Sequence, residues 1–207
     1  MRGDQVAAWT VRDHKVEATG GISSFVVDDI QTPSGELITR EYLSHPGAVA
    51  VVAWDETADT IACLRQYRHP VRMELVEIPA GLLDVNDEAW ADAARRELAE
   101  EAELAADRLD LLVDIVTSPG SMAESLRIYL ARDLRPAARP EGFVLEGEEA
   151  HMSVEWIDRA ELVEAIYAGA CQSPSLVTGV LSLEAARLGG RLPALRPVDS
   201  PWPIRQQ

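Results

Sequence analysis

The sequence predicts an α/β (α+β) fold in which helices and strands interleave, preceded by an N-terminal β-hairpin region. Three observations lead to this fold class. A near-continuous apolar run over Gly47–Trp54 is typical of a strand that is covered on both faces. A strand, a glycine-containing loop and a long helix then follow one another over residues 75–106. Helices and strands continue to alternate as far as residue 190, which favours a sandwich over an all-β barrel.

Length and charge restrict the class of protein. The chain has 207 residues, of which 47% are hydrophobic and 26% charged, so it can form a sizeable core. Its net charge of -16 at pH 7 disfavours binding to nucleic acids and to anionic membranes. No apolar run reaches the roughly 18 residues of a membrane span, and the first residues lack a secretory signal, so we expect a cytoplasmic protein. The two cysteines, Cys63 and Cys171, are expected to be reduced and buried.

The first part of the chain predicts the hairpin. Residues Ile22–Ile30 are rich in β-branched side chains, Thr32–Gly35 has proline and glycine where a turn favours them, and Glu36–Leu43 returns as a second strand. We therefore expect three regions: an N-terminal strand and hairpin region over 1–46, a main domain over 47–190, and an extended proline-rich tail over 191–207.

The centre of the main domain is a strand, a loop and a helix. A strand over Leu75–Pro79 runs into the loop Ala80–Asp84. Asn86 and Asp87 are then residues of the type that caps a helix N-terminus. The sequence therefore predicts a long helix that begins there and continues to about Ala106.

The second half of the chain predicts further strands and two helices. A loop over residues 135–149 contains two prolines and two glycines, and loops of that length are more often functional than idle. Trp54, Trp90 and Trp156 lie in apolar runs and are expected in the core. The remaining expected boundaries are strands at Thr60–Tyr67, Leu109–Val116, Ser125–Leu130 and Met152–Ile157, and helices from Asp158 or Arg159 to Gly169 and from Ser173 to Gly189.

Two glutamates of the long helix lie inside its apolar stripe. On a helical wheel of about 100° per residue with Glu97 at zero, Glu101 lies at about 40°, among apolar positions such as Trp90 and Ala94. Glu100 lies at the margin of the stripe, at about -60°, and the other charged residues lie on the opposite side. Only Glu97 and Glu101 therefore depart from the pattern of a solvated acidic face.

A carboxylate pair that turns inward needs compensation. Side chains four residues apart on a helix have Cβ atoms about 5 to 6 Å apart, and at about 6 Å two carboxylates repel by roughly 3 kcal/mol at an effective dielectric of about 20. Several converging oxygens suit Mg²⁺ or Mn²⁺, and no convincing set of His or Cys ligands supports zinc. An internal salt bridge from Arg65, Arg68 or Arg72 is the structural alternative.

A metal beside a glycine-containing loop indicates chemistry on phosphate esters or anhydrides. Mg²⁺ usually keeps several waters and shares its ligand shell with substrate phosphates. Hydrolysis then needs a further carboxylate that takes a proton from the attacking water. Glu148 and Glu149, in the long loop, are the candidates.

These residues resemble the Nudix box, in which Gly, five residues, Glu and seven residues precede Arg-Glu-U-x-Glu-Glu-x-Gly-U, where U is aliphatic. Here Gly81 is followed after six residues by Glu88, and after seven more by the run Arg96–Leu104. The chain departs from the box by the extra residue before Glu88 and by Glu103 in place of glycine, which removes a helix-ending residue, so we expect the helix to run on. The resemblance implies a Nudix-like α/β/α sandwich with a mixed β-sheet.

The same resemblance implies roles for the residues of the box. Glu97 and Glu101 correspond to metal ligands and Glu100 to an auxiliary ligand. The carbonyl of Ala80 completes the metal shell, and Arg96 orients the glutamates.

Within the family, the chain is similar to the ADP-ribose pyrophosphatases. Pro119 lies fifteen residues after Leu104, where that subgroup has a proline about sixteen residues past the box. The subgroup takes its catalytic base from the long loop, which favours Glu149, with Glu148 next, and it forms homodimers that exchange their N-terminal regions. By this similarity the substrate contacts are Arg40 from the neighbouring subunit, Arg68 on a phosphate and Glu77 on a ribose hydroxyl.

The implied activity is Mg²⁺-dependent hydrolysis of the diphosphate of ADP-ribose to AMP and ribose 5-phosphate, with Mn²⁺ as the alternative ion. A different nucleoside diphosphate sugar is an alternative substrate, because the box serves the chemistry that these compounds share. An alternative of another class is a non-catalytic sensor that binds ADP-ribose or a related nucleotide. A sensor is expected to have lost one of the box carboxylates, and here all are present.

Overall fold

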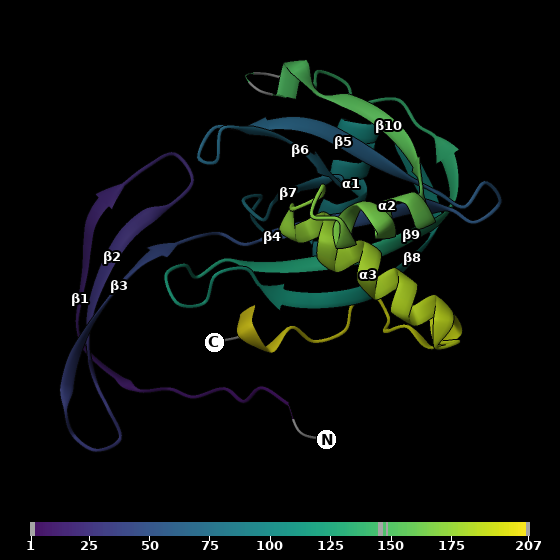
Figure 1. The fold of residues 1–207 in the computed structure, drawn as a ribbon. Helices are drawn as coiled ribbons and strands as arrows, with labels where there is room; N and C mark the ends of the chain where they lie inside the picture. The colour runs from purple at the N-terminus through teal and green to yellow at the C-terminus, as the bar shows by residue number, and fades with distance from the viewer. Residues whose placement is uncertain (1–2, 145–146, 148, 206–207) are drawn as a thin grey trace. The chain divides into compact units, whose positions relative to one another are not determined.

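The computed structural model describes residues 3–144, 147 and 149–205, which form two compact units (Figure 1). The first unit comprises the described residues of Met1–Gly47, Ile115–Ser125 and Pro201–Gln207. The second unit comprises the described residues of Ala48–Asp114 and Leu126–Ser200.

The first unit contains a three-stranded antiparallel sheet in the order β1, β2, β3. Its strands are β1 (Thr10–Thr19), β2 (Ser24–Gln31) and β3 (Leu37–Ser44). The backbone N–H of Gly35 donates to the carbonyl of Thr32 at 2.9 Å in the β2–β3 turn, so the predicted hairpin is confirmed. The sequence analysis did not find β1, because all ten of its residues are exposed and they contain no apolar run.

The second unit is built on a seven-stranded mixed sheet, as the resemblance implied. Its path is β10, β5, β4, β9, β8, with β6 paired to β5 and β7 paired to β4. β4 runs parallel to β9 and antiparallel to β5 and β7. The strands are β4 (Ala48–Asp55), β5 (Thr60–Arg68), β6 (Met73–Glu77), β7 (Ala80–Leu82), β8 (Leu104–Val116), β9 (Ser125–Pro136) and β10 (Ser153–Asp158).

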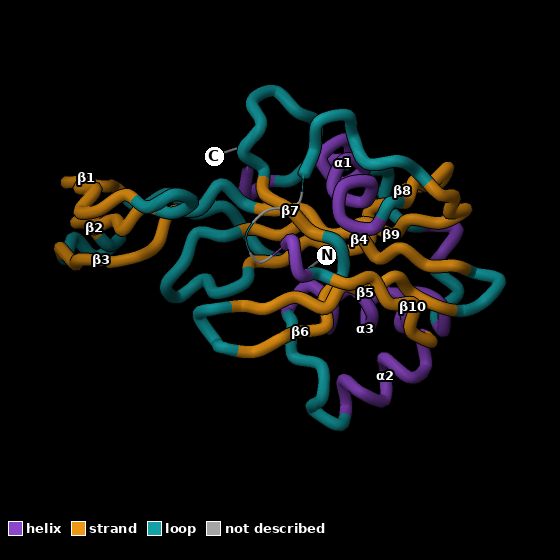
Figure 2. Tube along the Cα trace, turned by 90° about the horizontal axis from the view of Figure 1, so that it is seen from above, coloured by secondary structure: helices purple, strands orange, loops and turns teal. Residues whose placement is uncertain are grey.

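Helices cover both faces of this sheet (Figure 2). The helices are α1 (Trp90–Ala102), α2 (Arg159–Tyr167) and α3 (Pro174–Leu188). Val49 and Val51 of β4 share a core cluster with α1. Val52 points to α3 on the other face, where a Cβ added to Gly179 would lie 2.7 Å from its side chain. Successive side chains of β4 therefore serve opposite layers, as the near-continuous apolar run predicted.

α1 is shorter than the sequence predicted at both ends. The N-cap is Ala89, and not Asn86 or Asp87, and no side chain caps the helix there. At the other end Glu103 adopts the left-handed conformation, with φ of 54°, so the helix ends without the glycine that this position favours. The expectation that the helix continues to Ala106 is therefore wrong.

The second half of the chain follows the sequence closely, with two corrections. The carboxylate of Asp158 caps α2, and Ser173 is the N-cap of α3, as expected. The tail contains short 3₁₀ turns at Leu192–Ala194 and Pro203–Arg205, so it is not extended throughout. Trp156 is 46% exposed and does not belong to the core, because β10 is an outer strand of the sheet.

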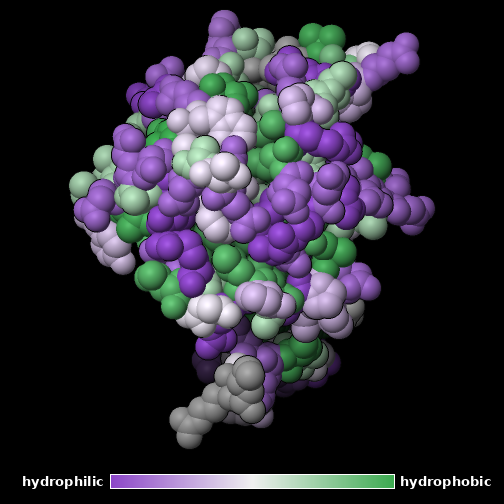
Figure 3. All heavy atoms as spheres, turned by 90° about the vertical axis from the view of Figure 1, so that its right-hand side faces the viewer, coloured by the Kyte–Doolittle hydropathy of each residue, from purple (hydrophilic) through white to green (hydrophobic). Residues whose placement is uncertain are grey.

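No helix among the described residues is long and apolar enough to cross a bilayer. The face drawn in Figure 3 mixes hydrophilic and hydrophobic side chains, and hydrophilic residues predominate. This composition agrees with the net charge of -16.

The two cysteines are free and buried, as expected. Burial raises the pKa of the Cys63 thiol to about 12, so it stays protonated at neutral pH. Cys63 is therefore an unreactive core residue.

Candidate metal centre

The inward-facing carboxylates predicted on α1 are buried in the structure. Glu97 is 8% exposed and Glu101 is 6% exposed, which confirms that both lie in the apolar stripe of the helix. Glu100, placed at the margin by the helical wheel, is also only 8% exposed. Three carboxylates therefore leave bulk water within two turns of one helix, and each loses solvation that other groups must replace.

The loop before α1 supplies part of this compensation. The backbone N–H of Ala80 donates to the Glu101 carboxylate at 2.8 Å. Ala80 is held in place because β7 pairs with β4, where Ala80 lies opposite Ala50. The sheet therefore fixes the position of the donor, and the donor fixes the orientation of Glu101.

Position 81 has no space for a side chain between the loop and the Glu97 carboxylate. A Cβ built on Gly81 would lie 1.9 Å from the carboxyl carbon of Glu97 and 1.9 Å from its Oε1 atom. No side chain fits between this loop and the helix unless the Glu97 carboxylate moves. The glycine thus allows the backbone of β7 to contact the carboxylate directly.

Arg96 connects the remaining carboxylates. Its Nε and Nη2 atoms donate to the two oxygens of Glu88, each at 3.0 Å. Its Nη1 atom donates to Glu97 at 2.6 Å and to Glu100 at 3.0 Å. The hydrogen bond that Arg96 donates to Glu88 is the main cause of the raised pKa of Arg96, so this guanidinium is firmly charged.

The Arg96 cluster revises two points of the sequence analysis. Glu88, to which the sequence analysis assigned no role, is a partner of Arg96. The structural alternative was a salt bridge to the inward carboxylates from Arg65, Arg68 or Arg72. In the structure Arg65 pairs with Glu155 at 3.0 Å and Arg68 pairs with Glu77, and Arg96 is the arginine that pairs with Glu97. The i to i+4 spacing of Arg96 and Glu100 could have indicated their ion pair from the sequence.

The donor set fits a hard divalent cation. Three carboxylates, of Glu88, Glu97 and Glu100, share one guanidinium, and a fourth, of Glu101, is buried on the same helix. All candidate ligands are oxygen atoms, which Mg²⁺ and Mn²⁺ prefer. In the described part of the chain, no three His, Cys, Asp or Glu side chains already surround a common point as ligands do. Arg96 instead holds three of these carboxylates, those of Glu88, Glu97 and Glu100, by hydrogen bonds.

Arg68 and Glu77, predicted as substrate contacts, contact each other. Arg68 at the end of β5 donates to Glu77 at the end of β6, with a shortest distance of 2.5 Å. The Arg68 side chain is 44% exposed, whereas that of Glu77 is 7% exposed. The pair therefore presents the guanidinium outward and keeps the carboxylate beneath it.

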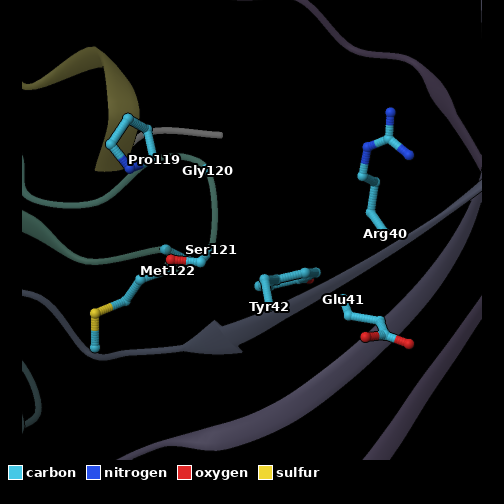
Figure 4. Close-up of a pocket in the computed structure, with 8 residues that line it drawn as sticks. Arg40, Glu41, Tyr42, Pro119, Gly120, Ser121 and Met122 are labelled. Carbon is cyan, nitrogen blue, oxygen red and sulfur yellow. The ribbon is translucent and has the colours of Figure 1, made fainter.

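Arg40 lies in the first unit, in a separate pocket of about 240 Å³ (Figure 4). Arg40, Glu41 and Tyr42 of β3 line one side, and Pro119 and the residues up to Ala123 line the other. Arg40 donates to the carbonyl of Thr39 at 2.8 Å. The structure thus brings together Arg40 and Pro119, two residues that the sequence analysis singled out for separate reasons.

The structure only partly describes the candidate bases. Glu149 begins a short 3₁₀ turn, Glu149–His151, which precedes β10. Glu148 lies outside the described residues. The assignment of the catalytic base therefore stays a prediction.

Comparisons with known proteins identify similar sequences and a similar fold. The NUDIX domain family matches residues 44–175. An ADP-ribose pyrophosphatase of Mycobacterium tuberculosis is 41% identical over 184 residues, covering 89% of this chain and 86% of that protein. An ADP-ribose pyrophosphatase of Bacillus subtilis is 37% identical over 116 residues, 56% of this chain and 62% of that protein. The crystal structure of an ADP compounds hydrolase, 20% identical, has a TM-score of 0.72 over 92% of this chain and 100% of that chain, which shows a shared fold.

The Gly81 contact predicts a specific loss of metal binding. In Gly81→Ala the new methyl group displaces the Glu97 carboxylate, so we expect Mn²⁺ affinity, measured by calorimetry, to fall by about 10-fold or more. Gly21→Ala is the matched control, because its added Cβ meets nothing within 4 Å. Unchanged Mn²⁺ affinity in a folded Gly81→Ala protein would contradict the assignment of Glu97.

Proposed function

This chain belongs to the NUDIX family, and on that premise we propose that it hydrolyses the diphosphate of ADP-ribose to AMP and ribose 5-phosphate. The observation that carries the proposal is the buried carboxylate cluster of α1 against the glycine loop. The high identity to an ADP-ribose pyrophosphatase over most of the chain supports this substrate. The presence of every carboxylate of the box favours an enzyme over a sensor.

We further propose Mg²⁺ as the cofactor, with Mn²⁺ as an alternative. Glu97 and Glu101 are the proposed ligands, with Glu100 as an auxiliary ligand and the Ala80 carbonyl completing the shell. When bound, such an ion neutralises charge on the diphosphate and lowers the pKa of a bound water. The oxygen donors and the burial of neighbouring carboxylates support this choice of ion.

The protein's own groups then orient the metal ligands and deprotonate the attacking water. Arg96 is proposed to orient the glutamates through its hydrogen bonds to Glu97 and Glu100. The Ala80 N–H restricts Glu101 to one orientation. A carboxylate of the long loop, Glu149 or else Glu148, takes the proton of the attacking water.

Substrate recognition is proposed to involve residues outside the box. Arg68 is suited to a phosphate because its guanidinium is partly exposed, and Glu77 beneath it is suited to accept from a ribose hydroxyl. Arg40 is proposed to act on the substrate of the neighbouring subunit in a homodimer. Its place in a pocket with Pro119 supports a role in ligand contact.

This function assigns a role to each region of the chain. We propose residues 1–46 as the dimerisation segment, 47–190 as the hydrolase domain and 191–207 as the tail. We also propose a cytoplasmic location, which cell fractionation tests.

The first test is turnover. ADP-ribose with Mg²⁺ should yield AMP and ribose 5-phosphate, and Glu97→Gln or Glu101→Gln should lower kcat by about 10²-fold or more, because each removes a metal ligand. Asp92→Asn is the matched control, because Asp92 lies on the same helix but its side chain is 66% exposed. Wild-type rates in either Gln variant would refute the ligand assignment. A panel of nucleoside diphosphate sugars tests the choice of substrate. If another sugar is hydrolysed faster than ADP-ribose, that sugar is the preferred substrate. Binding of these compounds without turnover would indicate a sensor.

The catalytic base is tested by comparing neighbouring glutamates. Glu149→Gln should lower kcat by about 10²- to 10⁴-fold, because the attacking water loses its proton acceptor. Mn²⁺ affinity, measured by calorimetry, should stay within about twofold of wild type, because the base is not a metal ligand. Glu148→Gln is the matched comparison, and a larger kcat loss in that variant would transfer the role to Glu148.

The position of Arg40 predicts complementation between inactive variants. If Arg40 acts in its partner's site, a mixed dimer of Arg40→Ala and Glu97→Gln subunits contains one site with both residues intact. Equimolar mixing, with exchange of subunits, should then restore about a quarter of wild-type kcat, because about half of the dimers are mixed and each has one intact site. No recovery in dimers shown to be mixed would place Arg40 in the site of its own subunit or outside any site.

A further inference from the structure

The loop that follows β9 is attached to the C-terminal end of α1. The backbone N–H of Ala137 donates to the carbonyl of Glu103 at 2.8 Å. Nε of Arg139 donates to the carbonyl of Glu100 at 2.8 Å. Nη1 of Arg139 also lies 2.9 Å from the Glu103 carboxylate. We call these three contacts of Ala137, Arg139 and Glu103 the loop anchor.

The loop anchor places a positive charge next to the negative groups at the C-terminal end of α1. Carbonyl groups at a helix C-terminus carry partial negative charge and favour cations nearby. The last turn of α1 contains no basic residue, whereas Glu100 and Glu101 lie there and Glu103 follows. Arg139 supplies the cation from the loop, and its side chain is only 34% exposed. The attachment of the loop to this helix is therefore charge-specific.

Glu103 is the residue at which the chain departs from the Nudix box. Its φ of 54° is a conformation that glycine adopts freely and that an L residue adopts at a cost. Glycine at this position would end the helix equally well, but it could not pair with Arg139. The carboxylate at 103 therefore has a partner that explains its presence in an unfavourable backbone conformation.

The loop anchor contacts the same residue that faces the candidate metal centre. The carbonyl of Glu100 accepts from Arg139, while its carboxylate accepts from Arg96. The same loop continues to Glu149, the proposed base. A catalytic group misplaced by about 1 Å can cost about 10²-fold in rate. Fixing the loop to α1 thus relates the position of the base to that of the metal ligands.

We propose that Arg139 and Glu103 are positioning residues, which hold the loop carrying the catalytic base against the helix carrying the metal ligands. This inference rests on the proposed hydrolase function. Their proposed effect is on the placement of the base.

The test separates positioning from stability. Glu103→Gly restores the residue of the box, relieves the left-handed conformation and removes the ion pair. We expect kcat for ADP-ribose to fall by about 10-fold to 10²-fold, with KM within about twofold and a melting temperature that does not decrease. Arg139→Gln should lower kcat similarly, and Arg139→Lys should recover part of it, because the charge near Glu103 is kept.

Two further variants control the comparison. Arg135→Gln removes a nearby ion pair, with Asp107, in which both side chains are more than half exposed, and kcat should not change. The double variant Glu103→Gly with Arg139→Gln should be no slower than the slower single variant, because both remove one interaction. Wild-type kcat in both Glu103→Gly and Arg139→Gln would overturn the proposal. So would a double variant whose loss of kcat is the product of the two single losses. A loss of kcat that parallels a fall in melting temperature across the variants would also overturn it.

A second measurement keeps the inference separate from the proposed function. Amide hydrogen exchange of the segment 137–143 should become faster in Arg139→Gln and in Glu103→Gly, and stay as in wild type in Arg135→Gln. Unchanged exchange in both anchor variants would overturn the loop anchor even in an active enzyme. If wild type lacks ADP-ribose turnover while exchange behaves as expected, the proposed function fails and the positioning role fails with it, although the attachment itself stands.

Discussion

Burial of neighbouring negative charges on α1 is the constraint on which the candidate site depends. A helix that packs three carboxylates at or below 8% exposure must supply groups that replace water. Arg96 and the Ala80 N–H supply part of this compensation, and the proposed divalent cation supplies more of it. The same arrangement that would be unfavourable in an ordinary core is thus suited to an ion-dependent reaction on a diphosphate.

This constraint extends to the packing between α1 and the sheet. The face of α1 in the core cluster is mostly alanine, including Ala93, Ala94 and Ala102, and it meets the small residues Ala53 and Ala131 of the sheet. Small side chains on both surfaces allow the helix to lie close to the strands. Close approach is what lets the helix carboxylates contact the β7 backbone. Larger residues at these positions would separate helix and loop, so the composition of the core and the geometry of the site are linked.

The sequence predicted the parts of this arrangement that depend on local periodicity. The helical wheel identified Glu97 and Glu101 as buried, because a period of 3.6 residues determines which side chains share a face. It did not find Glu88, whose pairing with Arg96 depends on how the preceding loop folds back on the helix. Likewise, the end of α1 could not be read from helix propensity, because Glu103 adopts a conformation stabilised by a residue 36 positions later in the chain.

The proposed metal ligands and the proposed substrate contact Arg40 lie in parts of the chain with different physical requirements. The carboxylates of α1 need a rigid support, which two layers of helix on a mixed sheet provide. Arg40 and Pro119 belong instead to the other compact unit, where a three-stranded sheet and a turn form their pocket. The hydrogen bonds of Arg96, Glu97 and Ala80 described above lie within the second unit. In the proposed function, Arg40 acts on the substrate from a unit other than the one that holds the buried charges, which agrees with box residues that alone do not determine which diphosphate sugar is hydrolysed.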